Sequence, residues 1–392
     1  MGRLCTVRDV DWSGKTALVR VDFNVPMQDG RVADDTRIRA ALPTLQFLRE
    51  KGAKIVLLSH LGRPDGKPAE KYSLKPVAAR TAELLGAEVR FAADCVGPAA
   101  EDAVSALNPG EVVLLENVRF HAEEEANDSG FAGQLAGLAD VFVNDAFGTA
   151  HRAHASTEGL AQYLPAVAGL LMEKEIVSLG SALEEPARPF VGIVGGAKVS
   201  SKLAVLENLI DRVDRLLIGG GMANTFLKAQ GREVGKSLLE ADLVGTAADL
   251  LQRGGKIVLP VDVVVTMDLK GSAPPRTTTI DDIRPDEMIV DIGPQTAKLF
   301  ASEIGPAGTV LWNGPMGIFE DPRFAAGTLS VARAMAESKG TTVVGGGESV
   351  QAVEQAGLAD KLTHVSTGGG ASLEFIEGKV LPGVAALKRD CT

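Results

Sequence analysis

The chain has 392 residues, and at about 150 residues per domain this length predicts two domains or slightly more. Hydrophobic residues make up 45% of the chain and charged residues 23%, which excludes disorder for most of it. The formal net charge of −11 argues against a nucleic-acid partner bound over a broad basic face, and leaves room for a local basic pocket. No segment approaches the ~20 uncharged residues of a membrane helix, so we expect a cytoplasmic protein without a membrane partner.

Short apolar runs alternate along the chain with segments of helical period, a pattern typical of βα units and parallel sheets. Strands are expected at residues 17–21, 55–58, 112–115 and 141–143 in the first half, and at 190–194, 216–218, 257–259, 310–312 and 342–344 in the second. Amphipathic helices are expected over residues 36–51, 202–213 and 325–338. The sequence therefore predicts an α/β fold with two doubly wound parallel-sheet (Rossmann-like) domains.

A helix at residues 170–183 is followed by a stretch with prolines, which stop a helix and mark a linker. We expect this helix to join the two domains as a hinge. The predicted division is an N-terminal domain over 1–169, an interdomain helix and linker over 170–187, a C-terminal domain over 188–373 and a tail over 374–392.

Basic and polar residues follow the expected strands of the first half, where parallel strands present their carboxyl ends at one edge of the sheet. They include four of the five histidines: Asp22, Asn24, His60, Arg63, Arg119, His121, His151, Arg152 and His154. Arg37, at the start of the first helix, can reach the same space. Each arginine alone is explained by a surface ion pair with Asp34, Asp35 or Glu116. The set as a whole favours a site for a small, multiply charged anion, because guanidinium groups match phosphate and carboxylate.

Glycine clusters follow the expected strands of the second half, at residues 195–196, 219–221, 345–347 and 368–370. Each precedes an expected helix, so free backbone N–H groups would favour phosphate there. Lys198 and Lys202 are expected four residues apart on one helix face. Turn formation alone explains any single cluster, whereas the four together favour a nucleotide.

Other classes of site are less well supported. His151 and His154 lack the partners of a zinc site, and the cysteines Cys5, Cys95 and Cys391 include no CxxC pair. No GxSxG, P-loop or GxGxxG motif is complete, which argues against a serine hydrolase, a P-loop enzyme and an NAD-dependent dehydrogenase. A non-catalytic protein that closes around a phosphorylated ligand stays open as an alternative.

The ordered motifs resemble those of one family, phosphoglycerate kinase, over nearly the whole chain. They are residues 21–26 (VDFNVP), 60–64 (HLGRP), 116–120 (ENVRF), 145–148 (DAFG) with His151 and Arg152, 195–199 (GGAKV), 312–315 (WNGP) through Glu320, and 366–370 (STGGG). The resemblance implies reversible, Mg²⁺-dependent phosphoryl transfer between 1,3-bisphosphoglycerate and ADP, giving 3-phosphoglycerate and ATP, in a monomer whose tail packs back on the N-terminal domain.

The resemblance also implies roles for individual residues. The N-terminal domain would bind the glycerate acid through Asp22, Phe23, Asn24, Arg37, His60, Leu61, Gly62, Arg63, Arg119 and Arg152. The C-terminal domain would bind the nucleotide through Lys198, Lys202, Gly220, Gly293, Asn313, Glu320, Gly346, Gly347, Glu348 and Ser349. The catalytic residues would be Arg37, Lys198, Gly369 and Gly370.

The chemistry of the acceptor agrees with this assignment. A carboxylate, with an ordinary pKa near 4, is already ionised at neutral pH and needs no general base. Alignment and charge neutralisation remain, and they require closure of the domains about the hinge. One residue departs from the family pattern: Glu348 stands where an aspartate usually meets the metal, so Mg²⁺ ligation is assigned to Glu348 as an expectation only.

Overall fold

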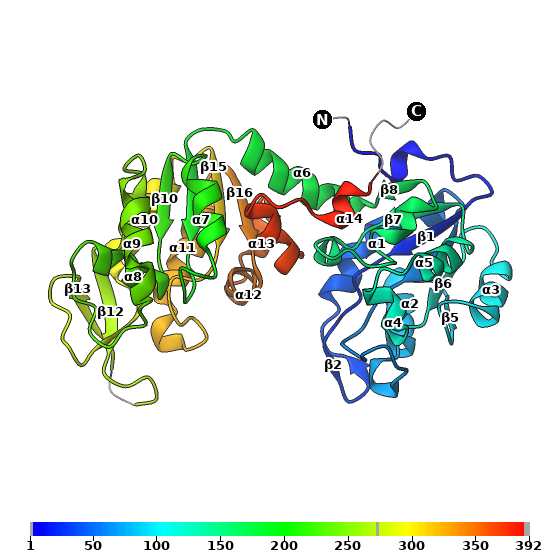
Figure 1. The fold of residues 1–392 in the computed structure, drawn as a ribbon, viewed down its shortest axis with the longest axis horizontal. Coiled ribbons are helices and arrows are strands. Elements are labelled where there is room, and N and C mark those ends of the chain that lie inside the picture. Colours follow the sequence, from blue (N-terminus) through cyan, green and yellow to red (C-terminus); the bar gives the residue numbers. More distant parts are fainter. Residues whose placement is uncertain (1–2, 272–273, 388–392) are drawn as a thin grey trace. The chain divides into compact units, whose positions relative to one another are not determined.

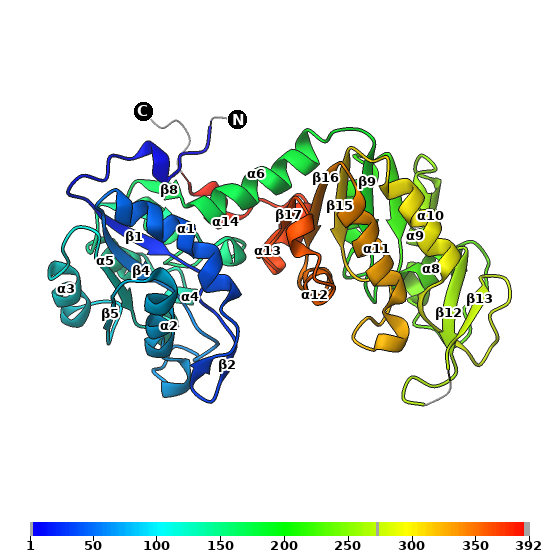
Figure 2. The ribbon, with the colours of Figure 1, turned by 180° about the vertical axis from the view of Figure 1, so that it is seen from behind.

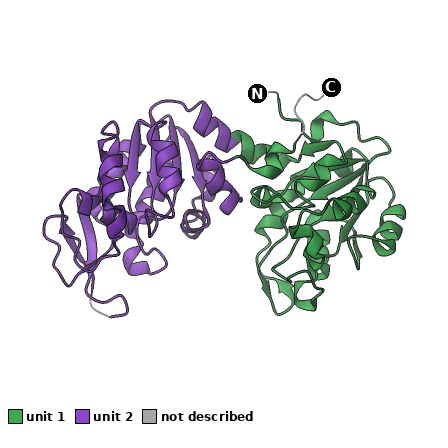
Figure 3. Cartoon of the chain, viewed as in Figure 1, with its two compact units in different colours: residues 1–177, 380–392 green, residues 178–379 purple. Residues whose placement is uncertain are grey.

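The computed structural model of the protein describes residues 3–271 and 274–387. The chain divides into two compact units (Figure 3). Unit 1 comprises Met1–Val177 and the segment from Val380 onward, and unit 2 comprises Ser178–Lys379. Among the described residues, no helix has both the length and the apolar character to cross a membrane.

Unit 1 is built on a six-stranded parallel sheet of order β5-β6-β4-β1-β7-β8 (Figure 1). Its strands are β1 (Thr16–Arg20), β4 (Lys54–Leu58), β5 (Val89–Ala92), β6 (Val112–Leu115), β7 (Val141–Asn144) and β8 (Ala166–Ala168), with a small hairpin of β2 (Met27–Gln28) and β3 (Arg31–Val32). Its helices are α1 (Thr36–Glu50), α2 (Lys75–Leu85), α3 (Pro98–Ser105), α4 (Ala122–Glu125), α5 (Ser129–Ala136) and α14 (Pro382–Ala385). Short 3₁₀ turns lie at η1 (Val7–Asp9), η2 (Glu70–Tyr72), η3 (Val118–Phe120), η4 (Phe147–Thr149) and η5 (Gly159–Gln162).

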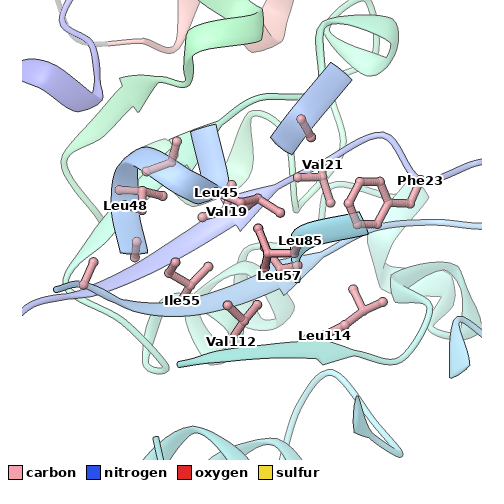
Figure 4. Packing of buried hydrophobic residues seen from close by; sticks show 14 of the residues in the cluster. Val19, Val21, Phe23, Leu45, Leu48, Ile55, Leu57, Leu85, Val112 and Leu114 are labelled. Carbon is pink, nitrogen blue, oxygen red and sulfur yellow. The ribbon is translucent and has the colours of Figure 1, made fainter. Parts of the chain in front are cut away.

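The core of unit 1 explains why these strands read as continuous apolar runs. Val19, Ile55, Leu57 and Leu114 point from the sheet into one cluster with residues of α1 and α2 (Figure 4). The alternate strand residues, such as Val56, are completely buried as well. Because side chains alternate between the two faces of a strand, both faces of this sheet are covered, as parallel sheets require.

Unit 2 contains a second six-stranded parallel sheet, of order β11-β10-β9-β15-β16-β17 (Figure 2). Its strands are β9 (Phe190–Val194), β10 (Arg215–Ile218), β11 (Ile257–Val258), β15 (Thr309–Asn313), β16 (Thr341–Gly345) and β17 (His364–Val365). In chain order this is 3-2-1-4-5-6, the arrangement typical of dinucleotide-binding folds. The order reverses between β9 and β15, which is where a ligand is expected in such sheets.

Helices and a smaller sheet complete unit 2. The helices are α7 (Leu203–Ile210), α8 (Met222–Ala229), α9 (Val244–Gln252), α10 (Pro294–Ile304), α11 (Ala326–Glu337), α12 (Gly347–Gln355) and α13 (Gly370–Ile376), with 3₁₀ turns η6 (Ala241–Leu243), η7 (Pro322–Phe324) and η8 (Ala359–Lys361).

The α/β prediction is confirmed, and each expected strand is present. The sequence did not predict the antiparallel sheet of β12 (Asp262–Thr266), β13 (Arg276–Thr279) and β14 (Met288–Ile292).

The helix α6 (Leu170–Glu184) connects the two units, and the division falls inside it, between Val177 and Ser178. The predicted division instead put the whole helix and the following linker, 170–187, in a segment of their own. It also began the tail at residue 374, whereas contacts keep residues up to Lys379 with unit 2, where α13 packs on α7. From Val380 the chain belongs to unit 1, and Gly383 N–H donates to the carbonyl of Ala150 (2.9 Å). Tail residues 388–392 lie outside the described residues.

The buried carboxylate of Asp145 holds the first turn of α6. Asp145 Oδ1 accepts hydrogen bonds from the backbone N–H groups of Leu171 (3.0 Å) and Met172 (3.3 Å). A Cβ on Gly169 would lie 2.1 Å from the same oxygen, so only glycine fits beside it. Burial raises the pKa of Asp145 to about 7, although the hydrogen bonds oppose the shift.

The raised pKa of Asp145 predicts a pH-dependent stability of unit 1. Between an unfolded pKa near 4 and the folded pKa of about 7, the folded chain keeps a proton that the unfolded chain has released, so stability decreases as pH rises through this window. We expect this decrease to be smaller in the Asp145→Asn variant, in which the raised pKa of the buried Glu124 still contributes in the same direction. Urea unfolding at several pH values, followed by Trp12 fluorescence in a Trp312→Phe background, measures the free energy of unfolding of unit 1.

The matched control is Asp102→Asn, because Asp102 is an exposed aspartate of the same unit. It should retain the wild-type pH dependence. The assignment is wrong if Asp145→Asn and wild type lose stability in parallel between about pH 4 and about pH 7.

Candidate functional site

The polar set of unit 1 lies at the carboxyl ends of adjacent parallel strands. Asp22 and Asn24 follow β1, His60 follows β4, and Arg119 lies in η3, directly after β6. Since β6, β4 and β1 are neighbours in the sheet, these residues emerge at the same edge. The sheet therefore gathers side chains that lie almost one hundred residues apart along the chain.

Direct hydrogen bonds join part of this set. The Asn24 side-chain oxygen accepts from the Gly62 N–H (2.9 Å), and Arg119 Nη1 donates to the Gly62 carbonyl (2.9 Å). Arg37 Nη1 donates to Asp22 Oδ2 (3.0 Å) and to the Asn24 carbonyl (3.1 Å). Asp22, Asn24, Arg37, Gly62 and Arg119 thus form one network.

Two expected residues, Phe23 and Leu61, are buried. The Phe23 ring lies in the unit 1 core and its N–H donates to Ser59 Oγ (2.9 Å), while the Leu61 carbonyl accepts from Asn117 Nδ2 (2.8 Å). A ligand at this edge could therefore be met by the backbone of these residues and not by their side chains.

His60 is buried among arginines. Burial comes first in holding the pKa of His60 well below its usual value, followed by the charges of Arg20, Arg119, Arg152 and Arg37. His60 is therefore uncharged at neutral pH and can act as a hydrogen-bond donor or acceptor, not as a cation. Its electrostatic coupling to Arg152 places that arginine near the network as well.

The remaining basic residues of the expected set lie in different surroundings. Arg63 is exposed. Burial and nearby arginines lower the pKa of His154 to about 4. His121 turns to Asp94 (Nε2 to Oδ1, 2.7 Å) and stacks against Phe131, which explains it without an anion ligand.

Sequence reasoning missed three buried polar residues beside this network, namely Arg20, Glu124 and Ser156. Arg20 is the last residue of β1 and is 1% exposed. A charged residue inside an apolar strand run was the signal that could have revealed it, because such residues are rarely buried without partners. Glu124 and Ser156 carry no comparable signal in their local sequence.

Unit 2 has a cavity of about 290 Å³ near the reversal of strand order. Apolar side chains of α8, the loop after α8, the antiparallel sheet and the loop after β15 line much of it: Leu227, Leu238, Val263, Ile289, Ile292, Met316 and Ile318. Three residues expected to bind nucleotide, Gly220, Glu320 and Glu348, are also in its wall. An apolar cavity with few polar groups suits a flat aromatic ring system.

Lys202 and Asn313 are joined near this cavity, and Ser349 bonds to the residue that follows Asn313. Lys202 Nζ contacts the Asn313 side-chain oxygen, and Asn313 Nδ2 donates to the Gly345 carbonyl (2.9 Å). Ser349 Oγ accepts from the Gly314 N–H (2.5 Å). Burial lowers the pKa of Lys202, and the Glu348 carboxylate opposes this shift.

Lys198 and Lys202 do not share a helix face, so that prediction was wrong. The helix α7 begins only at Leu203, and Lys202 is its N-cap residue. Residues 198–202 instead form a loop, in which Ser200 Oγ donates to the Glu240 carboxylate (2.5 Å) and Ser201 Oγ to the Lys198 carbonyl (2.9 Å). Serines compete with the helix by such local bonds. The Lys198 side chain is exposed.

Several second-half glycines are required by packing between loops. A Cβ on Gly195 would lie 2.1 Å from the Pro315 carbonyl oxygen, and one on Gly314 would lie 2.2 Å from the Gly195 oxygen. The N–H groups of Gly195, Gly196 and Gly220 already donate to backbone carbonyls. The expectation that the first two clusters offer free N–H groups to phosphate was therefore wrong for these three amides.

Two glycine clusters do begin helices without a side-chain cap. Gly346 is the N-cap of α12, and Gly369 is the N-cap of α13. Neither N-cap makes a side-chain bond to the first-turn N–H groups. In α13 the Ala371 N–H donates to the Gly368 carbonyl (2.9 Å), and the other first-turn donors point out of the helix start. Gly293 differs, because Asp262 accepts the N–H groups of Gln295 and Thr296 in the first turn of α10.

The described residues contain one group of histidine, cysteine and acidic side chains close enough to hold a metal, namely Asp94, Cys95 and His121. Glu348 is not part of it. Mg²⁺ is nevertheless often bound by one or two carboxylates together with substrate phosphates. The exposed Glu348 carboxylate, in the first turn of α12 and in the cavity wall, fits that pattern.

Comparisons with known proteins agree on one family. The family model described as phosphoglycerate kinase matches residues 7–379. The phosphoglycerate kinase of Moorella thermoacetica is 59% identical over 386 residues, covering 97% of this chain and 98% of the relative. That of Chloroflexus aurantiacus is 59% identical over 393 residues, covering 98% of each chain.

Solved structures give the same result. The phosphoglycerate kinase of Coxiella burnetii matches with a TM-score of 0.91 and 42% identity, and that of Pyrococcus horikoshii with a TM-score of 0.85 and 37% identity. Each match covers 98% of both chains. In sequence and in fold, over nearly its whole length, this chain belongs to the phosphoglycerate kinase family.

Proposed function

We propose that this kinase transfers a phosphoryl group reversibly between 1,3-bisphosphoglycerate and ADP, giving 3-phosphoglycerate and ATP, with Mg²⁺. The glycerate acid binds unit 1, the nucleotide binds unit 2, and closure about α6 as a hinge brings them together. The observation that carries this proposal is the pairing of a basic network in one unit with an apolar cavity and two uncapped helix starts in the other.

The acid site consists of the unit 1 network. Arg37, Arg119 and Arg152 supply positive charge to the phosphate and carboxylate of the acid, with Arg63 free at the surface to join them. His60 supplies a neutral hydrogen bond. Asp22 and Asn24 hold the loops in place, and Phe23, Leu61 and Gly62 present backbone groups.

The nucleotide site uses the cavity for the base and the helix starts for the phosphates. Gly220 and Glu320 lie in the cavity wall. Gly293, whose N–H donates to the Asp262 carbonyl, supports the start of α10 next to the antiparallel sheet. The phosphates meet residues of the loop before α7, of the end of β15 and of the start of α12: Lys198, Lys202, Asn313, Gly346, Gly347, Glu348 and Ser349.

Transfer requires alignment and charge neutralisation, and no general base. The acceptor carboxylate is already ionised, so no residue has to remove a proton from it. The neutral His60 donates a hydrogen bond and transfers no proton. Arg37, Lys198 and the N–H groups at Gly369 and Gly370 stabilise the charge on the transferred group. Glu348 would hold Mg²⁺, which supplies further neutralisation of the phosphates when it is bound.

The proposal includes a cytoplasmic, monomeric enzyme whose partners are its small-molecule substrates. The chain carries a net charge of −11, which disfavours nucleic acid as a partner. Light scattering of the purified chain measures its mass in solution and tests the monomer directly.

A coupled assay with 3-phosphoglycerate, ATP and Mg²⁺ tests the proposed reaction. We expect turnover with these substrates, and the reverse reaction with 1,3-bisphosphoglycerate and ADP. Folded protein without turnover in either direction would falsify the proposal, whereas calorimetric binding of both substrates without product would support a binding protein instead.

Replacing Lys198 by alanine tests its catalytic role. The exposed ammonium group meets charge that develops in the transition state, so we expect Lys198→Ala to lower kcat by about 100-fold or more. KM for both substrates should change by about threefold or less. Steady-state kinetics measures both quantities.

The control for Lys198 is Lys339→Ala, which removes another exposed lysine of unit 2. It should leave kcat unchanged. An unchanged kcat in Lys198→Ala, or an equal loss in kcat and in binding, would refute the proposed role.

Shortening Glu348 tests the metal assignment. An aspartate is the residue usual at this position in the family, and octahedral Mg²⁺ is sensitive to ligand geometry. We expect Glu348→Asp to lower by several-fold the free Mg²⁺ concentration that gives half-maximal rate. The exposed Glu337 provides the control Glu337→Asp. The same Mg²⁺ requirement in Glu348→Asp and wild type means that Glu348 does not contact the metal.

A further inference from the structure

A buried hydrogen-bonded chain of side chains ends on His60. The Arg20 guanidinium donates from Nε to Ser156 Oγ (2.7 Å) and from Nη1 to the Val21 carbonyl (2.6 Å). Its third nitrogen, Nη2, lies 3.3 Å from His60 Nδ1. With three fixed partners and 1% exposure, Arg20 has little freedom to turn away.

Glu124 holds the other end of this chain. It lies in α4 and is completely buried. Glu124 Oε1 accepts from Ser156 Oγ (2.6 Å), and Oε2 accepts from the Ser156 N–H (2.9 Å). The Ser156 hydroxyl therefore donates to Glu124 and accepts from Arg20, which orients both groups. The negative charge of Glu124 also offsets the burial of the Arg20 cation, whose pKa desolvation lowers first.

The chemistry of arginine decides which nitrogen of His60 carries the proton. A guanidinium group has donors only, so the His60 Nδ1 that faces Arg20 must accept. A neutral imidazole has one N–H and one acceptor nitrogen, and its proton must then be on Nε2. The ring is left with a single donor.

We propose that Arg20, held by Glu124 through Ser156, is a positioning residue that keeps the proton of His60 on Nε2, so that this nitrogen donates to the bound acid. The inference rests on the proposed function in one respect only, the identity of the ligand. The hydrogen-bond state of His60 follows from unit 1 itself.

The charges that face His60 come from several elements. They are Arg20 of β1, Arg37 of α1, Arg119 of η3, and Arg152 after β7, with Asp22 and Glu124 as the carboxylates coupled to Arg20. A second proton on the ring would lie on Nδ1 against the Arg20 cation. The Nε2 N–H of His60 therefore remains the donor of a neutral ring while the pH varies around neutrality. The hydrogen-bond geometry of the site does not change with pH in this range.

Nitrogen NMR of the full chain labelled with ¹⁵N-histidine measures the state of the ring, because a protonated and an unprotonated ring nitrogen differ in chemical shift. The His60→Gln variant assigns the signals. We expect Nε2 protonated and Nδ1 unprotonated, without titration from about pH 5.5 to about pH 8. A proton on Nδ1, or a charged ring near pH 7, would overturn the inference.

Variants test whether Arg20 maintains this state. In Arg20→Met the proton can occupy either nitrogen, so we expect signals of both forms and a KM for 3-phosphoglycerate raised about 10-fold or more. The KM for ATP should stay within about twofold. Ser156→Ala should act in the same direction and more weakly. The matched control is Arg39→Met, because Arg39 is exposed and pairs with Asp35.

The outcomes separate this inference from the proposed function. An unaltered ring state in Arg20→Met, or an equal rise of both KM values, assigns Arg20 a structural role only and overturns the inference. If Arg20→Met does not fold, Ser156→Ala and the wild-type ring state decide. Absence of any turnover with 3-phosphoglycerate would contradict the proposed function, while the ring nitrogens would still report on Arg20.

Discussion

The parallel alignment of strands is the constraint on which the rest of this molecule depends. In both units every strand of the large sheet runs in the same direction, so all of their carboxyl ends meet at one edge. Residues as distant as Asn24 and Arg119 both reach hydrogen-bonded contact with Gly62 for this reason. The same constraint places the unit 2 cavity at the reversal of strand order between β9 and β15.

Unit 1 contains buried charged side chains. The chain as a whole is acidic, yet its N-terminal unit concentrates arginines around His60, and two of them, Arg20 and Arg119, are almost fully buried. Such cations are stable only where carboxylates and hydrogen-bond acceptors meet them. Glu124 does this for Arg20 through Ser156, and Glu125 does it for Arg119 at 3.1 Å. Local concentration of charge, and not net charge, suits this unit to an anionic ligand.

The sequence predicted most of the large sheets because buried parallel strands are short apolar runs, which stand out from their surroundings. The strand β13 was missed because its sequence, Arg-Thr-Thr-Thr, contains no apolar residue. The division inside α6 could not be read either, since a continuous helix gives no local signal of where its contacts change from one unit to the other.

The candidate site was predictable to a similar extent. Motif order pointed to residues such as Asn24 and Arg119 because they follow strands, and position after a strand is visible in sequence. The helix start after Lys202 was not, because serine bonds to Glu240 and to Lys198 replace the expected first turn. The sequence also could not distinguish the roles of two glycines. Residue 195 must be glycine because the backbone of another loop packs closely against it, whereas Gly346 is the N-cap of a helix.

The central claim is that the two units divide the substrates between them. Hydrogen exchange of the full chain, read by mass spectrometry, tests it with one substrate at a time. With 3-phosphoglycerate alone we expect protection in the loops around Asn24, His60 and Arg119, and with ATP and Mg²⁺ alone in those around Met316 and Gly346. Protection of the same unit by both substrates would contradict the account.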